Sequence, residues 1–235
     1  MATTRTVAAT TQLNPNVDRG AADVLRDFLE RVPIPRWAPV RLEHDAERLD
    51  DVAAAVAAEF RRPGIGDAIR PGARVALTAG SRGIDRIAEV LAAVAAEVRQ
   101  RAAEPFIVPA MGSHGGATAE GQRNVLAHYG VTEERVGCPI RASMEVVELG
   151  RLPSGERLYT DRVAYENADL ILPISRVKPH TDFHGTYESG LYKMLAIGLG
   201  KQRGADSLHA SGFDRFHELI PAAGRVVLAR LPVPF

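Results

Sequence analysis

The sequence has only one cysteine, Cys138, so no disulfide can form within the chain. So low a cysteine content is typical of proteins from a reducing compartment, and we interpret Cys138 as a small buried thiol. The formal net charge is zero at pH 7, because the sequence has 29 basic and 29 acidic residues. The composition therefore gives no electrostatic support for binding to nucleic acid or to an anionic membrane.

Long apolar runs are absent as well. No run reaches the roughly 18 residues of a membrane-spanning helix, and the first twenty residues lack the apolar centre of a secretory signal. With 46% hydrophobic residues, the 235-residue chain can still bury a sizeable core. We therefore expect a cytoplasmic enzyme, with a flexible tail over residues 1–22 and one catalytic α/β domain over residues 23–235.

Short apolar segments alternate with alanine-rich segments along the chain. We predict strands over residues 74–78, 106–109, 146–149, 170–174 and 224–231, a hairpin around Ser154-Gly155, and helices over residues 24–32, 49–60, 84–101, 191–199 and 213–222, with a further helix opening at Thr118. This alternation indicates a three-layer, Rossmann-like α/β fold, with a mostly parallel sheet and helices on both faces. Both faces of a parallel strand are normally covered by helices. Because the predicted strand over residues 224–231 lies at the end of the sequence, we expect that the natural protein is longer or that a partner covers this strand.

Three of the predicted strands end in polar loops. They are "TAGSRGI" with Ser81 and Arg82, "PAMGSHGGAT" with His114, and "ISRVKPHTDFH" with His180 and His184. Because ligands of open α/β sheets bind beyond the carboxyl ends of the strands, we expect these loops to surround one cleft.

Each of these loops has a plausible chemical use. A glycine loop before a helix can present N–H groups to an anion, and Arg82 can hold a carboxylate through two hydrogen bonds. Two histidines can exchange the roles of acid and base, which suits inversion of a carbon centre. The glycines can instead simply form a turn, and the arginine and the histidines can be surface groups. Together with His209, the loop histidines also permit a metal site, although HExxH, CxxC, P-loop and GxSxG motifs are absent.

The order of "TAGSRGI", "PAMGSHGGATAEGQ" and "VKPHTDFHGTYESGLYK" resembles the nickel-pincer lactate racemase family. The resemblance covers roughly residues 30–235, which correspond to the amino-terminal catalytic domain of that family. It implies racemisation or epimerisation of a small 2-hydroxy acid by hydride transfer to a lysine-tethered nickel-pincer nucleotide. The smaller carboxy-terminal domain that closes over the substrate in this family is absent from the chain.

The resemblance also implies roles for individual residues. They are His114 and His180 as the catalytic histidines, Arg82 as the ligand of the substrate carboxylate, Lys193 as the tethering lysine, Ser81 and Gly112 as further cofactor-binding residues, and His209 as the nickel ligand. The segment from His180 to Lys193 is longer than the HxxAGxSGGxK pattern of the family and contains Glu188. Two other functions stay open: a metal-dependent hydrolase or lyase that uses the loop histidines directly, and a non-catalytic domain that binds a carboxylate or phosphate.

Overall fold

The computed structural model describes residues 23, 25–26, 29–32, 36–41 and 48–234. The chain divides into two compact units, Met1–Glu47 and Arg48–Phe235. The predicted tail over residues 1–22 lies outside the described residues. Within the predicted helix over residues 24–32, the described residues 25–26 and 29–31 are helical. All of the elements discussed below belong to the second unit.

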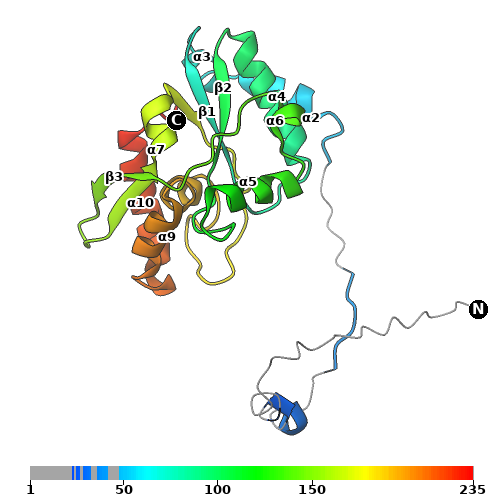
Figure 1. The fold of residues 1–235 in the computed structure, drawn as a ribbon, viewed down its shortest axis with the longest axis vertical. Coiled ribbons are helices and arrows are strands. Elements are labelled where there is room, and N and C mark those ends of the chain that lie inside the picture. Colours follow the sequence, from blue (N-terminus) through cyan, green and yellow to red (C-terminus); the bar gives the residue numbers. More distant parts are fainter. Residues whose placement is uncertain (1–22, 24, 27–28, 33–35, 42–47, 235) are drawn as a thin grey trace, which may run out of the picture. The chain divides into compact units, whose positions relative to one another are not determined.

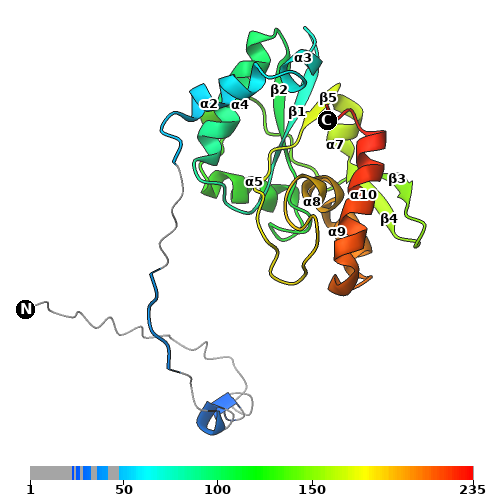
Figure 2. The ribbon, with the colours of Figure 1, turned by 180° about the vertical axis from the view of Figure 1, so that it is seen from behind.

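The main sheet of the second unit is parallel and has the order β2-β1-β5. The central strand β1 (Arg74–Ala79) pairs with β2 (Glu104–Pro109) on one side and with β5 (Leu170–Leu172) on the other (Figures 1 and 2). Leu77 lies opposite both Ile107 and Leu172. The prediction of an α/β fold with a mostly parallel sheet is therefore confirmed.

Helices cover both faces of this sheet. Helices α2 (Val52–Phe60) and α4 (Ile87–Gln100) lie on one side, and α9 (Lys201–His209) and α10 (Phe216–Arg230) lie on the other (Figure 2). Because successive side chains of a strand point to opposite faces, Leu77 joins one hydrophobic cluster and Ala76 joins the other. The remaining helical segments are α3 (Ile65–Ala68), α5 (Ala119–His128), α6 (Glu133–Val136), α7 (Arg162–Asn167), α8 (Leu191–Lys193), the π-helix η1 (Met194–Gly198) and the 3₁₀-helix η2 (Phe213–Arg215).

The predicted hairpin around Ser154-Gly155 is confirmed, but its first strand is not part of the main sheet. Strand β3 (Val146–Arg151) pairs antiparallel with β4 (Arg157–Asp161) in a separate two-stranded sheet. The prediction of a strand over residues 146–149 is correct, whereas its placement in the parallel sheet is wrong. The short turn explains the difference, because a parallel partner would need a crossover of a dozen residues or more.

The predicted last strand over residues 224–231 is wrong, because helix α10 continues to Arg230. Its buried residues Phe216, Ile220, Ala223 and Val227 recur every three or four positions, which is the period of a helix. Burial of one face of this helix outweighs the preference of the adjacent residues Val226 and Val227 for strand structure. Because this segment is a helix, the sequence contains no terminal strand here that would require a longer protein or a partner to cover it. Among the described residues, no helix is long and apolar enough to cross a membrane.

The carboxylate of Glu156 attaches the hairpin to the helical layer. It accepts hydrogen bonds from Ser211 Oγ at 2.7 Å and Arg215 Nη1 at 3.1 Å, and it also contacts Ser154 Oγ. Its side chain is only 5% exposed. These contacts, with that of Ser154 the largest, lower the pKa of Glu156 to about 2.

Acidification should therefore weaken the protein through Glu156. Because its pKa in the folded state lies below the value of about 4.3 for an unfolded glutamate, the charged form contributes stability above that pH. This contribution is lost as the pH falls through about 4 towards 2. We expect urea denaturation to show a shallower loss of stability over this range for Glu156→Gln than for the parent protein. Equal pH dependence in the two proteins would contradict this role.

Candidate functional site

A cavity of about 410 Å³ lies where the three parallel strands end. Its wall comes from the loops after β1, β2 and β5 and from the helical segments α8, η1, α9 and η2. All seven residues predicted for the site line this cavity, namely Ser81, Arg82, Gly112, His114, His180, Lys193 and His209. The strand-end pattern predicted this convergence for the residues of the three loops, whereas Lys193 and His209 were named from the resemblance alone; the chemical roles of all seven stay predictions.

The glycine loop after β2 is a turn that other residues could not form without strain. Gly112, Gly115 and Gly116 have φ values of 59°, 69° and 64°. A Cβ atom on Gly115 would lie 2.6 Å from the carbonyl carbon of Gly121. The loop then passes into α5, whose first turn is capped by Thr118 Oγ1, which accepts from Gly121 N at 3.0 Å. This turn carries His114 at the edge of the cavity.

His114 is oriented by the loop after β1. Its Nδ1 contacts Ser81 Oγ, and the Ser81 carbonyl accepts a hydrogen bond from Tyr129 Oη at 2.8 Å. The pKa of His114 is lowered, first by partial burial and then by the positive charges of Arg82 and Lys193. The imidazole is therefore neutral near pH 7, which is the form that can accept a proton. Sequence reasoning did not identify Tyr129.

A buried network of polar side chains is hydrogen-bonded to the backbone carbonyl of His114. Gln122 Nε2 donates to the carbonyl of His114 at 3.3 Å, and Gln122 Oε1 accepts from Lys201 Nζ at 3.1 Å. Lys201 Nζ also lies 3.0 Å from Asp161 Oδ2, and both side chains are fully buried. Burial lowers the pKa of Lys201 and raises that of Asp161, while their mutual attraction opposes both shifts. This network was missed at the level of sequence, although a lysine directly after the apolar run "MLAIGLG" was a usable signal.

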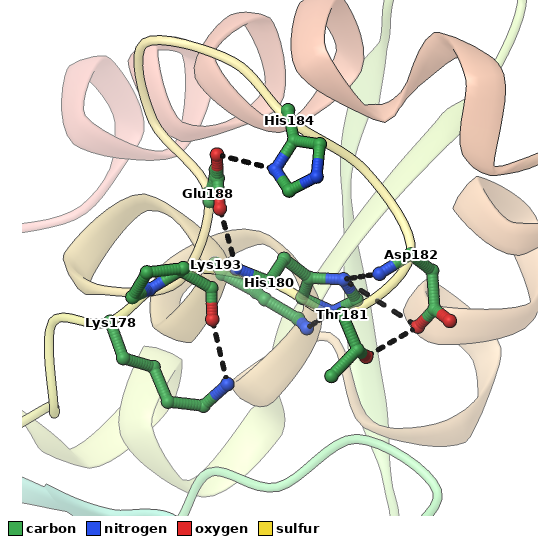
Figure 3. Close-up of polar contacts among 8 residues, drawn as sticks. Lys178, His180, Thr181, Asp182, His184, Glu188 and Lys193 are labelled. Atoms are coloured by element: carbon green, nitrogen blue, oxygen red, sulfur yellow. Dashed lines mark hydrogen bonds and ion pairs between the residues drawn. The ribbon is translucent and has the colours of Figure 1, made fainter. Parts of the chain in front are cut away.

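The segment between His180 and Lys193 is closed on itself by Glu188 (Figure 3). One carboxylate oxygen of Glu188 accepts from the backbone N of His180 at 2.5 Å, and the other accepts from Gly185 N at 3.2 Å. His184 Nδ1 lies 3.3 Å from the same second oxygen. The Glu188 side chain is 14% exposed and that of His184 is 82% exposed. Glu188 therefore shapes the loop, whereas His184 lies on its outer side and does not line the cavity.

His180 and Lys193 contact each other inside the cavity. His180 Nε2 lies 2.5 Å from Lys193 Nζ, and His180 Nδ1 accepts from the backbone N of Asp182 at 3.1 Å (Figure 3). Burial, followed by the charges of Arg82 and Lys178, lowers the pKa of Lys193 to about 8. Lys193 ends α8 and is followed directly by the π-helix η1. Such π-helical turns are frequent at functional sites.

His209 reaches the cavity from the end of α9, beside an aromatic wall. The centroid of its ring lies 5.5 Å from that of Phe213 and 5.2 Å from that of Phe216. The Phe213 ring is also 6.2 Å from that of His180. Phe213 thus lies between two of the predicted histidines, a placement that no local sequence pattern indicated.

The lining of the cavity is rich in positive charge. It contains four cationic side chains, those of Arg82, Arg176, Lys178 and Lys193, and one carboxylate, that of Asp182. Such a surface favours an anionic ligand. Within the part of the chain that the structure describes, no group of three or more histidine, cysteine, aspartate or glutamate residues is placed to hold a metal ion.

Comparison with known proteins returned no match, either to a protein-family model or to a curated protein. The function is therefore a proposal, which rests on the resemblance of the sequence segments and on the residues of the cavity.

Proposed function

We propose that this protein is a racemase or epimerase of small 2-hydroxy acids that carries a nickel-pincer nucleotide on Lys193. One observation carries the proposal: His114, His180, Lys193 and His209 converge on a single, positively charged cavity. These side chains come from three separate parts of the chain. The proposal includes a cytoplasmic location, which the low cysteine content supports.

The residues of the cavity fit such a cofactor. A volume of about 410 Å³ lies in the range of small-molecule sites. The partly buried amine of Lys193 would hold the cofactor through an amide, and the imidazole of His209 would bind nickel. Ser81 and Gly112 would lie beside it, and the cationic lining suits a nucleotide phosphate. When bound, the cofactor would supply a reversible acceptor of hydride.

The side chains of the protein would handle the substrate and its proton. Arg82 would bind the carboxylate of the hydroxy acid through two hydrogen bonds. The lowered pKa values of His114 and His180 favour neutral imidazoles, which can accept the hydroxyl proton and return it. Two bases are needed, because the two enantiomers present this proton from different sides. The apolar side chains of Met194, Ile197 and Phe213 in the lining would limit the access of water.

Metal analysis combined with intact mass spectrometry tests the proposal. Protein produced in a host that makes the cofactor should contain nickel and a covalent adduct. We expect Lys193→Ala to abolish the adduct and His209→Ala to lower the nickel content. His128→Ala is the matched control, because His128 is exposed at the end of α5 and does not line the cavity.

Two results would contradict this proposal and favour an alternative. Metal without an organic adduct would favour a hydrolase or lyase that uses the histidines directly. A protein with neither metal nor adduct, even from a host that loads a known racemase of this kind, would favour a domain that only binds an anion.

A further inference from the structure

The amide group of Gln122 contacts groups of opposite kinds at its two ends. Gln122 is fully buried, and one end of its amide lies 3.1 Å from Lys201 Nζ. The other end lies 2.8 Å from the carbonyl oxygen of Gly112 and 3.3 Å from that of His114. An ammonium group can only donate a hydrogen bond, and a carbonyl oxygen can only accept one. Oε1 therefore faces Lys201, and Nε2 faces the two carbonyls of the glycine loop.

The surroundings of Lys201 match a charged ammonium group. Its Nζ donates to the carbonyl of Pro109 and to Gln122 Oε1, and it lies 3.0 Å from Asp161 Oδ2 in a fully buried ion pair. Three N–H groups thus meet three oxygen atoms, and Asp161 compensates the charge. A neutral amine has one N–H group fewer, so its lone pair would face one of these oxygens. The charged form therefore determines the orientation of the Gln122 amide.

We propose that Gln122 is a positioning residue for His114, and that Lys201 fixes the amide of Gln122 in the orientation that this role requires. The inference rests on the proposed function only for the reaction that His114 performs. The position of the imidazole ring itself can be measured without a cofactor and without turnover.

The glycine loop needs this support because its backbone has few other restraints. Glycine loses more conformational freedom on folding than any other residue, and three glycines of this loop have positive φ values. Without Gln122, the carbonyls of Gly112 and His114 would lose their donor, and the loop would turn them towards water. Such a rotation of the backbone would move the ring of His114 away from Ser81 Oγ, which Nδ1 contacts.

The same network connects the glycine loop to the helices that carry Lys193 and His209. Lys201 begins α9, which ends at His209, and Gly112 N donates at 3.1 Å to a carbonyl of η1, which directly follows Lys193. Lys201 has a φ of 54°, a left-handed conformation that is uncommon for a residue other than glycine. Backbone strain of this kind persists where the surrounding contacts determine it. The network therefore determines how His114 lies relative to the two proposed cofactor ligands.

Substitutions of similar size separate the N–H donor of Gln122 from its volume. Gln122→Glu keeps an oxygen for Lys201 but places a second oxygen opposite the carbonyls of Gly112 and His114. Gln122→Met fills the space without a polar atom. We expect both changes to rearrange the glycine loop. Gln122→Asn, whose shorter amide cannot reach the two carbonyls and Lys201 together, replaces a variant that urea denaturation shows to be unfolded.

Nuclear magnetic resonance of the full chain with ¹⁵N-labelled histidine measures the position of the ring. Spectra are recorded at about pH 8, where an ordinary histidine is neutral, and the seven histidines are assigned by single substitutions. Ser81→Ala supplies the spectrum of a His114 ring without its Ser81 contact. We expect Gln122→Glu and Gln122→Met to move the His114 Nδ1 signal more than half of the way to its position in Ser81→Ala.

Turnover supplies a second measurement. In the cofactor-loaded protein, both Gln122 variants should lower kcat per bound nickel by about 10²-fold with KM unchanged, because misplacement by about 1 Å costs a factor of this order. The matched control is Gln202→Glu, the same change at an exposed glutamine beside Lys201 that does not line the cavity. It should leave both the His114 signal and kcat at their parent values.

The positioning role and the proposed function fail on different results. The positioning role is overturned if the folded Gln122 variants keep the parent signal of His114. It is also overturned if ¹⁵N-labelled lysine, of which the sequence has only three, shows Lys201 as a neutral amine at about pH 7 in the parent protein, where an ordinary lysine is charged. A displaced His114 ring with an unchanged kcat would keep the positioning role and would contradict His114 as a catalytic base.

Discussion

His114→Ala should lower the rate of racemisation by about 10²–10⁴-fold in both directions, which is the usual contribution of a general acid or base. Its imidazole is held at the edge of the cavity by Ser81 and by the turn of three glycines. Racemisation needs two bases, so the loss of one slows both the forward and the reverse reaction. The measurement is chiral chromatography of lactate after incubation with the cofactor-loaded protein.

Nickel content and adduct mass should stay unchanged in His114→Ala, because the proposed cofactor ligands are Lys193 and His209. The matched control is again His128→Ala, which should keep the parent rate. A His114→Ala protein that is fully loaded and racemises at the parent rate would rule out this mechanism.

Lys201→Met should destabilise the fold by about 3–5 kcal/mol, the cost of leaving one partner of a buried ion pair without the other. Lys201 Nζ lies 3.0 Å from Asp161 Oδ2, and neither side chain is exposed. Methionine fills a similar volume but cannot compensate the buried carboxylate. Urea denaturation at neutral pH measures the difference in the free energy of unfolding.

The stability loss in Lys201→Met should shrink as the pH falls. Burial already raises the pKa of Asp161, and removal of the nearby ammonium raises it further. A group whose pKa is higher in the folded state than in the unfolded state carries its full penalty only above the folded pKa, and the penalty vanishes below the unfolded value of about 4. Adding Asp161→Asn, which keeps a side-chain oxygen to cap α7, should recover part of the stability at neutral pH. A loss that is independent of pH, or no loss at all, would show that the pair is not charged in the folded protein.

The parts of the fold that follow from local pattern were predictable from the sequence. The apolar segments at β1, β2 and β5 are short and end in polar loops, so their parallel arrangement already places the loops at one edge. The cap at Thr118 and the turn at Ser154-Gly155 are local as well. These features explain why Ser81, Arg82, Gly112, His114 and His180 could be placed together before the structure was known, whereas Lys193 and His209 were named from the family resemblance alone.

The features that depend on distant contacts were not predictable in this way. Lys201 and Asp161 are far apart along the chain, and no spacing rule connects them. Helix α10 contains adjacent valines that favour a strand, and its helical period emerges only when the segment is extended back to Phe216. The placement of β3 outside the main sheet depends on its antiparallel partner. Tertiary packing determines the ion pair, the helical state of α10 and the position of β3.

The loop between β5 and α8, residues 173–190, is closed by its own hydrogen bonds and is anchored to α10 by Phe183, whose buried ring lies 5.5 Å from that of Phe216. Backbone hydrogen bonds between Lys178 and Ser189, at 3.3 and 3.4 Å, close residues 178–189, and Glu188 accepts from the backbone of His180 and Gly185 within this segment. For protein engineering, Phe183 is therefore the residue of this loop that must be kept. Libraries that vary Thr181 and Asp182, which line the cavity, would reshape one side of it while His180, Phe183 and Glu188 are kept, so that substrate range could be selected separately from folding.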